Sequence, residues 1–230
     1  MTSAAWPIEV RRGRAGELHA LALPEPIRPM VWSCELERPA LVLGSTQRDE
    51  VVDRAAAARA GVDVARRRSG GGAVLLVPGE MTWVDVLVPV GHPRWSDDVG
   101  RSSWWVGEAW AGALADLGVG DVHVHRGPLE RGPWSSLVCF AGMGPGEVRA
   151  AGRKVVGISQ RRTRAGARFQ CLLLHRWDPG ALLEVLALDE EARREARAAL
   201  AGAAGGIGAV QPSAEVVRAF AARLGEVAEG

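Results

Sequence analysis

Short apolar runs recur along most of this 230-residue chain, and glycine, proline or polar clusters separate them. Runs of this length, bounded by turn residues, are typical of β-strands. The pattern predicts strands at 41–43, 62–65, 74–77, 83–88, 122–125, 137–140, 147–150, 153–159 and 169–174. Ala151-Gly152 lies between two of these runs and suits a two-residue hairpin connection.

A helical spacing appears elsewhere. Apolar residues fall at i, i+4, i+7, i+8 and i+11 from Val106 to Leu117, which predicts a helix over about 98–117. The alanine-rich stretch 48–61 is also expected to be helical and to end at Gly61. Further helices are predicted at 178–186, 190–201 and 213–224. Asp178-Pro179, an N-cap followed by proline, opens the first of them.

The first thirty residues show neither pattern. Pro24, Pro26 and Pro29 divide the end of this segment, so we expect it to be irregular. The whole arrangement predicts an α+β fold with a mixed β-sheet and a helical C-terminal end. The length allows one large domain or two small ones. Because no repeat or low-complexity linker divides the chain, we expect a single domain over 1–230.

Composition and charge exclude several classes of protein. A hydrophobic content of 47% and a charged content of 24% are those of an ordinary globular protein. The net charge of +1 gives no general reason to expect nucleic acid or an anionic membrane as partner. No stretch approaches 18 apolar residues, and the N-terminus lacks the apolar core of a signal peptide. We therefore expect a cytoplasmic protein with no membrane association.

The three cysteines, Cys34, Cys139 and Cys171, are an odd number without C-x-x-C spacing. This indicates neither a disulfide framework nor a zinc site, and we expect no bound metal. In a reducing compartment each cysteine is either a small buried residue or a nucleophile.

The most informative stretch is 66–74, where three arginines lead into Ser69, three glycines and an apolar run. Consecutive glycines let the backbone approach a ligand closely and adopt positive φ. Basic side chains beside a bare backbone suit an anionic or carbonyl-bearing ligand. A flexible linker after an exposed basic face is the alternative, although the strand-like flanks weigh against it.

A second stretch, 152–160, contains Lys154, the only lysine beside 27 arginines. Lysine is a compact point charge whose pKa changes on burial, and arginine reproduces neither property. A chain that uses arginine almost everywhere and keeps one lysine therefore points to a functional ammonium group. The alternative is a chance surface lysine.

With these motifs placed, the chain resembles the lipoate–protein ligase and octanoyltransferase family, whose fold is shared with biotin–protein ligases. The resemblance covers about 32–186 and rests on the segments 44–47, 67–74, 139–140 and 152–162. It implies a class II synthetase-like catalytic domain, with a mixed sheet flanked by helices. It also implies attachment of a lipoyl or octanoyl group to a specific lysine of lipoyl-carrier domains.

The same resemblance assigns roles to residues. It implies that Lys154 contacts the activated acyl group and that the glycine loop lines the acyl pocket. The substrate-binding residues that it implies are Gly44, Arg68, Ser69, Gly70, Gly71, Gly72, Ala73, Val74, Gly157 and Ser159.

Two departures from the family pattern bear on the reaction. The ligases usually carry His-Asp and then Gly-Asn after the glycine loop, and this chain has Leu76-Val77 and Gly79-Glu80. Where the family usually has Gln-His-Gly-Ser, this chain has 170–173, Gln-Cys-Leu-Leu. The lost groups would help to handle nucleotide or metal, so ATP-dependent activation is weakened more than acyl binding.

Three interpretations remain open. In the favoured one Cys139 is a nucleophile that takes the acyl group from acyl carrier protein, without a tightly bound cofactor, and Lys154 favours its thiolate. In the second, a ligase uses ATP and Mg²⁺ to form an acyl-adenylate. The third is a non-catalytic acyl-binding paralogue. In all three the expected partners are lipoyl-carrier domains of 2-oxoacid dehydrogenase complexes or the glycine cleavage protein. The apolar neighbours of Cys139 also allow it to be only a buried strand residue.

Overall fold

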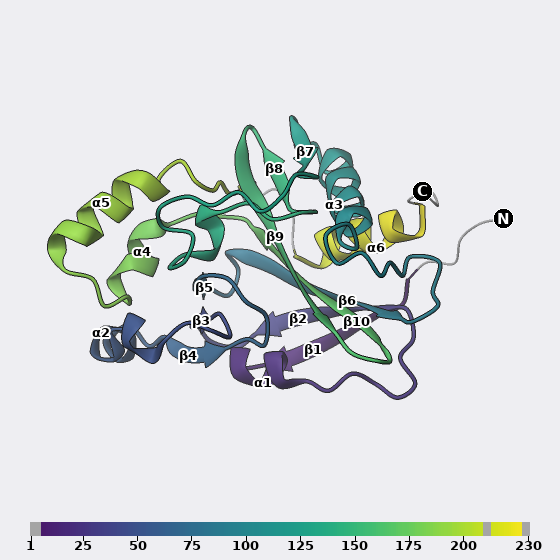
Figure 1. Ribbon diagram of the computed structural model, residues 1–230, viewed down its shortest axis with the longest axis horizontal. Coiled ribbons are helices and arrows are strands. Elements are labelled where there is room, and N and C mark those ends of the chain that lie inside the picture. The colour runs from purple at the N-terminus through teal and green to yellow at the C-terminus, as the bar shows by residue number, and fades with distance from the viewer. Residues whose placement is uncertain (1–5, 209–212, 227–230) are drawn as a thin grey trace.

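The computed structural model describes residues 6–208 and 213–226, and it has the mixed sheet that the sequence predicts (Figure 1). Seven strands form the main sheet in the order β1-β2-β6-β10-β9-β8-β7. Its strands are β1 (Ile8–Gly13), β2 (Met30–Leu36), β6 (Met81–Pro89), β7 (Val122–Val124), β8 (Val148–Ala150), β9 (Arg153–Arg162) and β10 (Gly166–Leu174). β1 pairs with β2 in parallel, and the other pairings in this sheet are antiparallel.

A second, smaller sheet lies beside the first one in Figure 1. It consists of β3 (Ala40–Leu43), β4 (Asp63–Arg66) and β5 (Val74–Leu76), with β3 in the middle. β3 runs parallel to β4 and antiparallel to β5. The glycine loop connects β4 to β5, so the two strands that flank it are held by the same central strand.

Three of the described helices, α3, α5 and α6, have more than ten residues, and the others have six. They are α1 (Ala15–Ala20), α2 (Arg54–Arg59), α3 (Trp104–Asp116), α4 (Pro179–Glu184), α5 (Glu190–Leu200) and α6 (Ser213–Glu226), with 3₁₀ segments η1 (Asp49–Val51) and η2 (Cys139–Ala141). Among the described residues, no helix is long and apolar enough to cross a membrane.

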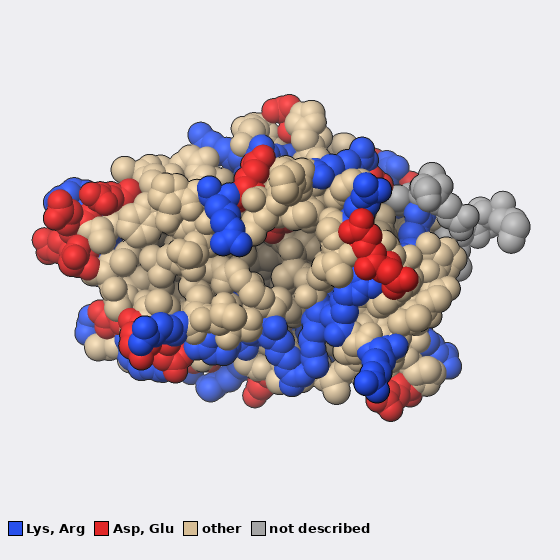
Figure 2. Space-filling model, in the orientation of Figure 1, with Lys and Arg blue, Asp and Glu red and all other residues tan. Residues whose placement is uncertain are grey.

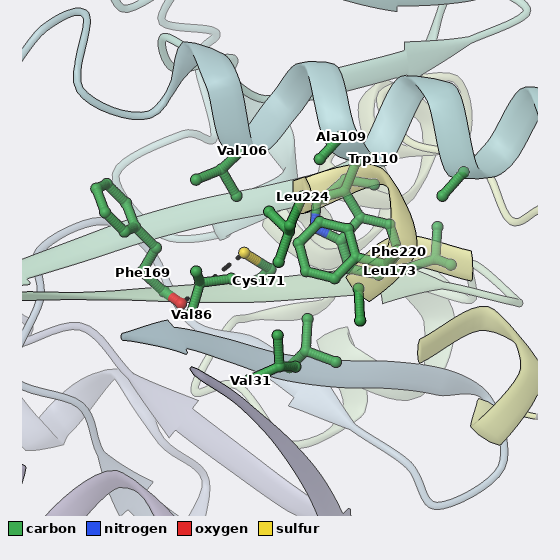
Figure 3. Packing of buried hydrophobic residues seen from close by; sticks show 14 of the residues in the cluster. Val31, Val86, Val106, Ala109, Trp110, Phe169, Cys171, Leu173, Phe220 and Leu224 are labelled. Carbon is green, nitrogen blue, oxygen red and sulfur yellow. Dashed lines mark hydrogen bonds between the residues drawn. The ribbon is translucent and has the colours of Figure 1, made fainter. Parts of the chain in front are cut away.

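One face of the main sheet carries the largest hydrophobic cluster, which α3 and α6 cover (Figure 3). The rings of Trp110 and Phe220 stack between these two helices with their centroids 4.2 Å apart. The helical stripe predicted for α3 is buried here, with Val106, Trp110 and Leu114 fully covered. Cys171 points into the same cluster, so this cysteine is a core residue.

The prediction of an irregular N-terminus was wrong. Residues 8–13 form β1, the edge strand of the main sheet, and residues 15–20 form α1. The β2 strand that follows was also not predicted. The β1 strand mixes charged and apolar residues and is half-exposed, so it has no apolar run; its order comes from backbone pairing with β2, as in Ile8 opposite Val31. The prolines lie in the connection from α1 to β2.

The predicted strand at 137–140 was also wrong. Only Val138 forms a bridge, with Ala73, and the chain then turns into the 3₁₀ segment η2. Ala73 donates to the carbonyl of Leu137 at 2.7 Å and accepts from the amide of Cys139 at 2.9 Å. Both hydrogen bonds are made by the backbone of one residue, Ala73, so the pairing does not extend into a β-ladder. Cys139 therefore lies on a turn.

The predicted helix at 48–61 is interrupted in a similar way. Its first part is the 3₁₀ segment η1, and Asp53 then opens a new helix, α2. The Asp53 side chain accepts from the amide of Ala56 at 2.8 Å, which is the normal arrangement of an aspartate N-cap.

A buried ion pair attaches α1 to the other face of the main sheet. Arg168 of β10 is 2% exposed and Asp85 of β6 is fully buried, and the Arg168 Nε donates to the Asp85 carboxylate at 2.9 Å. The same guanidinium donates to the carbonyl of Leu18 at 2.8 Å and to that of Leu21 at 3.1 Å. These carbonyls lie at the end of α1, so Arg168 determines where this helix rests.

We predict that Arg168→Met lowers the free energy of unfolding by about 3–5 kcal/mol, because it leaves Asp85 buried without its counter-charge. Urea denaturation measures the change. The matched control is Arg12→Met, which removes the exposed pair of Arg12 with Glu35 and should cost less than about 1 kcal/mol. Similar losses for the two variants would contradict a structural role for the buried pair.

Candidate functional site

A cavity of about 730 Å³ lies between the sheet face that carries α1 and the small sheet. Figure 2 shows a hollow near the middle of this face of the molecule, with basic side chains on both sides of it. The residues that line the cavity and enter the argument below are His19, Gly70, Gly71, Gly72, Val74, Trp83, Cys139, Phe140, Gly142, Glu147, Lys154, Gly157, Ser159 and Gln170.

The glycine loop forms one wall of the cavity, and Arg67 holds it in shape. Arg67 is buried, and its Nη2 donates to the carbonyls of Gly70 at 2.7 Å and Gly72 at 2.8 Å. Gly71 has φ +96°, and a Cβ there would lie 2.9 Å from the Arg67 Nη2. The loop is therefore an ordered, braced structure, which argues against a flexible linker. The sequence interpretation had not singled out Arg67 among the three arginines.

Glycine is required at two more places by close approach. A Cβ on Gly72 would lie 2.5 Å from the amide nitrogen of Val138, in the segment that leads to Cys139. A Cβ on Gly44 would lie 1.9 Å from the carbonyl oxygen of Gly71. Gly44 thus packs behind the loop and does not line the cavity. Ala73 is buried and joins the loop to the Cys139 segment through its backbone.

Lys154 is buried in the opposite wall, with 4% of its surface exposed. Its Nζ lies 2.5 Å from the Glu147 carboxylate and donates to the carbonyls of Gly142 at 3.0 Å and Cys139 at 3.3 Å. The ammonium also lies 4.9 Å from the centre of the Phe140 ring. An ammonium group has three N–H donors, and here each has an acceptor. Lys154 is therefore a buried ammonium group with all of its donors paired, which excludes the alternative of a chance surface lysine.

Glu147 was not identified from the sequence. Its carboxylate accepts from the amides of Gly144 at 2.6 Å and Ile158 at 3.1 Å, in addition to Lys154. It therefore connects the turn after η2 to β9 and fixes the ammonium between them. The available signal was that Glu147 is the only acidic residue between Glu130 and Asp178, in a stretch rich in glycine and arginine.

Cys139 and Cys171 both line the cavity, and of these two cysteines Cys139 is half-buried and Cys171 is buried. Cys34 and Cys171 are buried, and burial raises the pKa of both thiols well above the usual range. Lys154 reaches the backbone carbonyl of Cys139 and so lies beside this residue.

The remaining predicted residues divide into two groups. Val74, Gly157 and Ser159 line the cavity, and Ser69 donates from its Oγ to the Ser159 Oγ at 3.0 Å. Arg68 is exposed and does not line the cavity. Its charge lies close enough to Arg161 to lower the pKa of that guanidinium, after the larger effect of burial.

His19 of α1 and Gln170 of β10 form a polar part of the cavity wall next to Trp83 of β6. His19 is 9% exposed, and its ring packs on that of Trp83 with the centroids 4.5 Å apart. Gln170 Nε2 lies 3.1 Å from the His19 Nδ1. Burial first, and then the charges of Arg168 and Arg67, lower the pKa of His19 to about 3, so the imidazole is neutral near pH 7. Sequence analysis did not single out His19.

The sequence profile described as lipoyl protein ligase A/B catalytic domain matches residues 17–212. The chain belongs to this family. Among curated proteins, none is similar enough in sequence to count as a relative. The family match covers the glycine loop, the Cys139 turn and Lys154 together.

Solved structures of lipoate–protein ligases share the fold. A bi-partite lipoate protein ligase from Thermoplasma acidophilum, studied with its E2 lipoyl domain, superposes with a TM-score of 0.73 at 18% identity; the match covers 97% of this chain and 83% of that one. A lipoate-protein ligase A bound with ATP gives a TM-score of 0.63 at 18% identity, over 94% of this chain and 83% of that one. The mixed-sheet α+β architecture is thus that of lipoyl protein ligase catalytic domains.

We predict that Gly71→Ala destabilises the protein by about 1–3 kcal/mol and weakens binding of an octanoyl or lipoyl compound, because the new Cβ needs positive φ and displaces Arg67. Gly70→Ala is the matched control, since a Cβ at Gly70 meets nothing within 4 Å. Urea denaturation and calorimetric binding measure the two effects. Equal behaviour of the two variants would show that the shape of the loop is unimportant.

Because His19 is neutral in the folded protein, we predict that the free energy of unfolding depends on pH. The folded-state pKa of about 3 is below the ordinary value of 6.5, so stability from this group is complete above pH 6.5 and is lost as pH falls toward 3. The loss is about 1.4 kcal/mol for each pH unit in that window. His19→Gln should remove this part of the acid sensitivity measured by urea denaturation.

The control is His175→Gln, since burial alone lowers the pKa of His175, without the effect of a nearby arginine. The charged groups that act on His19 are Arg168 of β10 and Arg67 of the loop. An unchanged pH slope in His19→Gln, with a native fold at pH 7, would contradict the neutral buried imidazole.

Proposed function

We propose that this protein transfers a lipoyl or octanoyl group to a specific lysine of a lipoyl-carrier domain, with Cys139 as the nucleophile that receives the group from acyl carrier protein. The observation that carries the proposal is the position of Cys139, half-buried on the cavity wall beside the Lys154 ammonium. The other two cysteines are buried with raised pKa values, so neither is available as a thiolate near pH 7.

The chemistry needs two steps, and both balance without a further reactant. In the first, the Cys139 sulfur bonds to the acyl carbon, the bond to the donor sulfur breaks, and the cysteine proton ends on the departing thiol. In the second, the amine of the target lysine bonds to the same carbon and the bond to Cys139 breaks. A proton of the amine then returns to the cysteine sulfur.

In this mechanism Lys154 would stabilise the negative oxygen that forms in each step. Its three donors are already used, so an acyl oxygen must replace one acceptor. The bond to the Cys139 carbonyl is the longest at 3.3 Å, and it is the one we expect to be exchanged. Glu147 and the Gly142 carbonyl would keep the ammonium in place during the exchange.

The expected protein partner is a lipoyl-carrier domain of a 2-oxoacid dehydrogenase complex or of the glycine cleavage protein. The T. acidophilum ligase with the same fold was studied with an E2 lipoyl domain, which supports a partner of this kind. An ATP- and Mg²⁺-dependent ligase is the second candidate, and the ATP-bound ligase A of the same fold favours it. Both reactions would use the same cavity and Lys154.

We predict that incubation with octanoyl carrier protein alone leaves an octanoyl adduct on Cys139, which intact-mass and peptide analysis detect. Cys139→Ser should abolish the adduct and the transfer to a lipoyl domain, because a serine without an organised base is a far weaker nucleophile. Cys34→Ser is the control, since this buried cysteine should be dispensable for the adduct.

A parallel reaction with octanoate, ATP and magnesium separates the candidates. Modification of the lipoyl domain that depends on ATP, with no adduct on Cys139, would replace the transferase by the ligase. No modification under either condition would leave an acyl-binding protein without catalysis. Lys154→Arg should stop either reaction, because a flat guanidinium cannot occupy the three-acceptor site of the ammonium.

A further inference from the structure

β1 forms one edge of the main sheet, and the outer side of this strand has no partner strand among the described residues (Figure 1). The carbonyls of Pro7 and Gly13 each accept a backbone hydrogen bond on the side of β2. Successive residues of a strand direct their backbone groups to opposite sides, so those of Ile8, Val10 and Arg12 point outward. Within the described part of the chain, no other hydrogen bond occupies these N–H and C=O groups. β1 therefore offers a row of unused donors and acceptors.

The side chains of β1 have an order that suits pairing with a second copy of the same strand. We place the second copy antiparallel to the first, with a two-fold axis at Val10. Glu9 then lies opposite Arg11 of the second copy, and Arg11 lies opposite its Glu9. Ile8 lies opposite Arg12, and Val10 lies opposite its own copy. Each charge on one face of the strand thus meets a charge of the other sign.

The backbone geometry agrees with this arrangement. Ile8, Val10 and Arg12 direct their N–H and C=O groups outward, so they supply the hydrogen-bonded pairs of the new ladder. Glu9 and Arg11 then fall at the positions between those pairs, where opposite side chains come closest. Opposite charges stabilise a pair of strands most at such short range. The charge pairs and the free backbone groups therefore require the same register.

Other arrangements of two copies fit less well. A parallel pairing in register would place Glu9 opposite Glu9 and Arg11 opposite Arg11, which is unfavourable. An antiparallel pairing with the axis at Ile8 or Arg12 would lose both charge pairs. Charged side chains commonly protect an edge strand from unwanted pairing. Here their order protects against every arrangement considered except the one centred on Val10.

Two further features of β1 favour a partner. Ile8 is 38% exposed and Val10 is 50% exposed, and both lie on the same face of the strand. Pairing about Val10 would bring the two valines together and cover Ile8 with the aliphatic part of Arg12 from the second copy. On the other face Arg11 pairs with Glu9, and its guanidinium lies 5.1 Å from the centre of a tryptophan ring of β2. These charges are ordered in advance, which reduces the entropy lost on binding.

We propose that this protein forms a two-fold symmetric dimer, in which the β1 strands of two copies pair antiparallel about Val10 and join the two main sheets into one. The contact uses the same surface on both copies, as in most homodimers. The opposite edge strand, β7, has three residues and offers a shorter ladder. Because the paired segment is also short, we expect a dissociation constant of about 1–100 µM.

Sedimentation velocity of the full chain, over a concentration range of about 1–300 µM, should show an equilibrium between monomer and dimer. Val10→Pro should abolish the dimer, because proline removes an outward N–H that the pairing with β2 does not use. The melting temperature should stay close to that of the wild type for the same reason. Val10→Lys should also abolish the dimer, since it places two ammonium groups together on the axis. The matched control is Val90→Lys, because Val90 is equally exposed and lies away from β1.

Charge exchange tests the register of the two strands. Glu9→Arg and Arg11→Glu each place like charges opposite one another, and each should weaken self-association about tenfold or more. An equimolar mixture of these two variants should form a dimer at concentrations where neither does so alone. In the mixture one strand carries two cations and the other carries two anions, so both opposite pairs are restored.

A protein that is monomeric at every concentration would overturn the proposal. A dimer that survives in Val10→Pro and Val10→Lys would also overturn it, because another surface would then hold the two copies together. If Val10→Pro does not fold, Val10→Lys still decides the question, since it changes no backbone group. A wild type that dimerises, with no dimer in the mixture of Glu9→Arg and Arg11→Glu, would exclude the antiparallel register about Val10.

Discussion

The site depends on the burial of one ammonium group. An isolated lysine charge in the interior is strongly unfavourable, so Lys154 must be given a counter-charge and acceptors for its donors. The protein supplies Glu147 and the carbonyls of Gly142 and Cys139. Because these acceptors lie on the turn around η2 and the lysine lies on β9, satisfying the charge also determines where the Cys139 turn rests on the sheet.

The opposite wall is determined by a comparable constraint. The glycine loop exposes backbone carbonyls that no strand pairs, and the buried Arg67 guanidinium collects two of them. The loop packs closely against the segment that leads to Cys139, and this is possible because Gly72 has no side chain. Arg168 plays a similar part for α1, whose last carbonyls it binds beside Asp85. Buried cations thus shape both ends of the cavity.

This organisation explains why an acyl chain suits the cavity. Lys154 of β9 and His19 of α1 both line it, together with Gln170 of β10, which lies 3.1 Å from His19. Val74, Gly157 and Phe140 also line the cavity and offer apolar surface or bare backbone. The cavity therefore presents both charged and apolar surface to a ligand.

Much of the fold could be predicted from local pattern. The strands β3, β6 and β10 and the helix α3 have apolar runs or a helical stripe, because most of their residues are buried in the core. The β1 strand could not be predicted, because an edge strand needs only its backbone pairing with β2 and keeps charged side chains. The apolar run at 137–140 suggested a strand, but its residues are buried from different sides as the chain turns.

By itself the sequence determined the fold class and singled out the glycine loop and the solitary Lys154, because each depends on residue types that have few substitutes. Only the tertiary structure decided which groups complete the site. Glu147, Arg67, His19 and Gln170 come from four separate segments, and nothing in their local sequence shows that they meet. Their roles follow from burial, which makes each charge or polar atom seek a partner that lies far away along the chain.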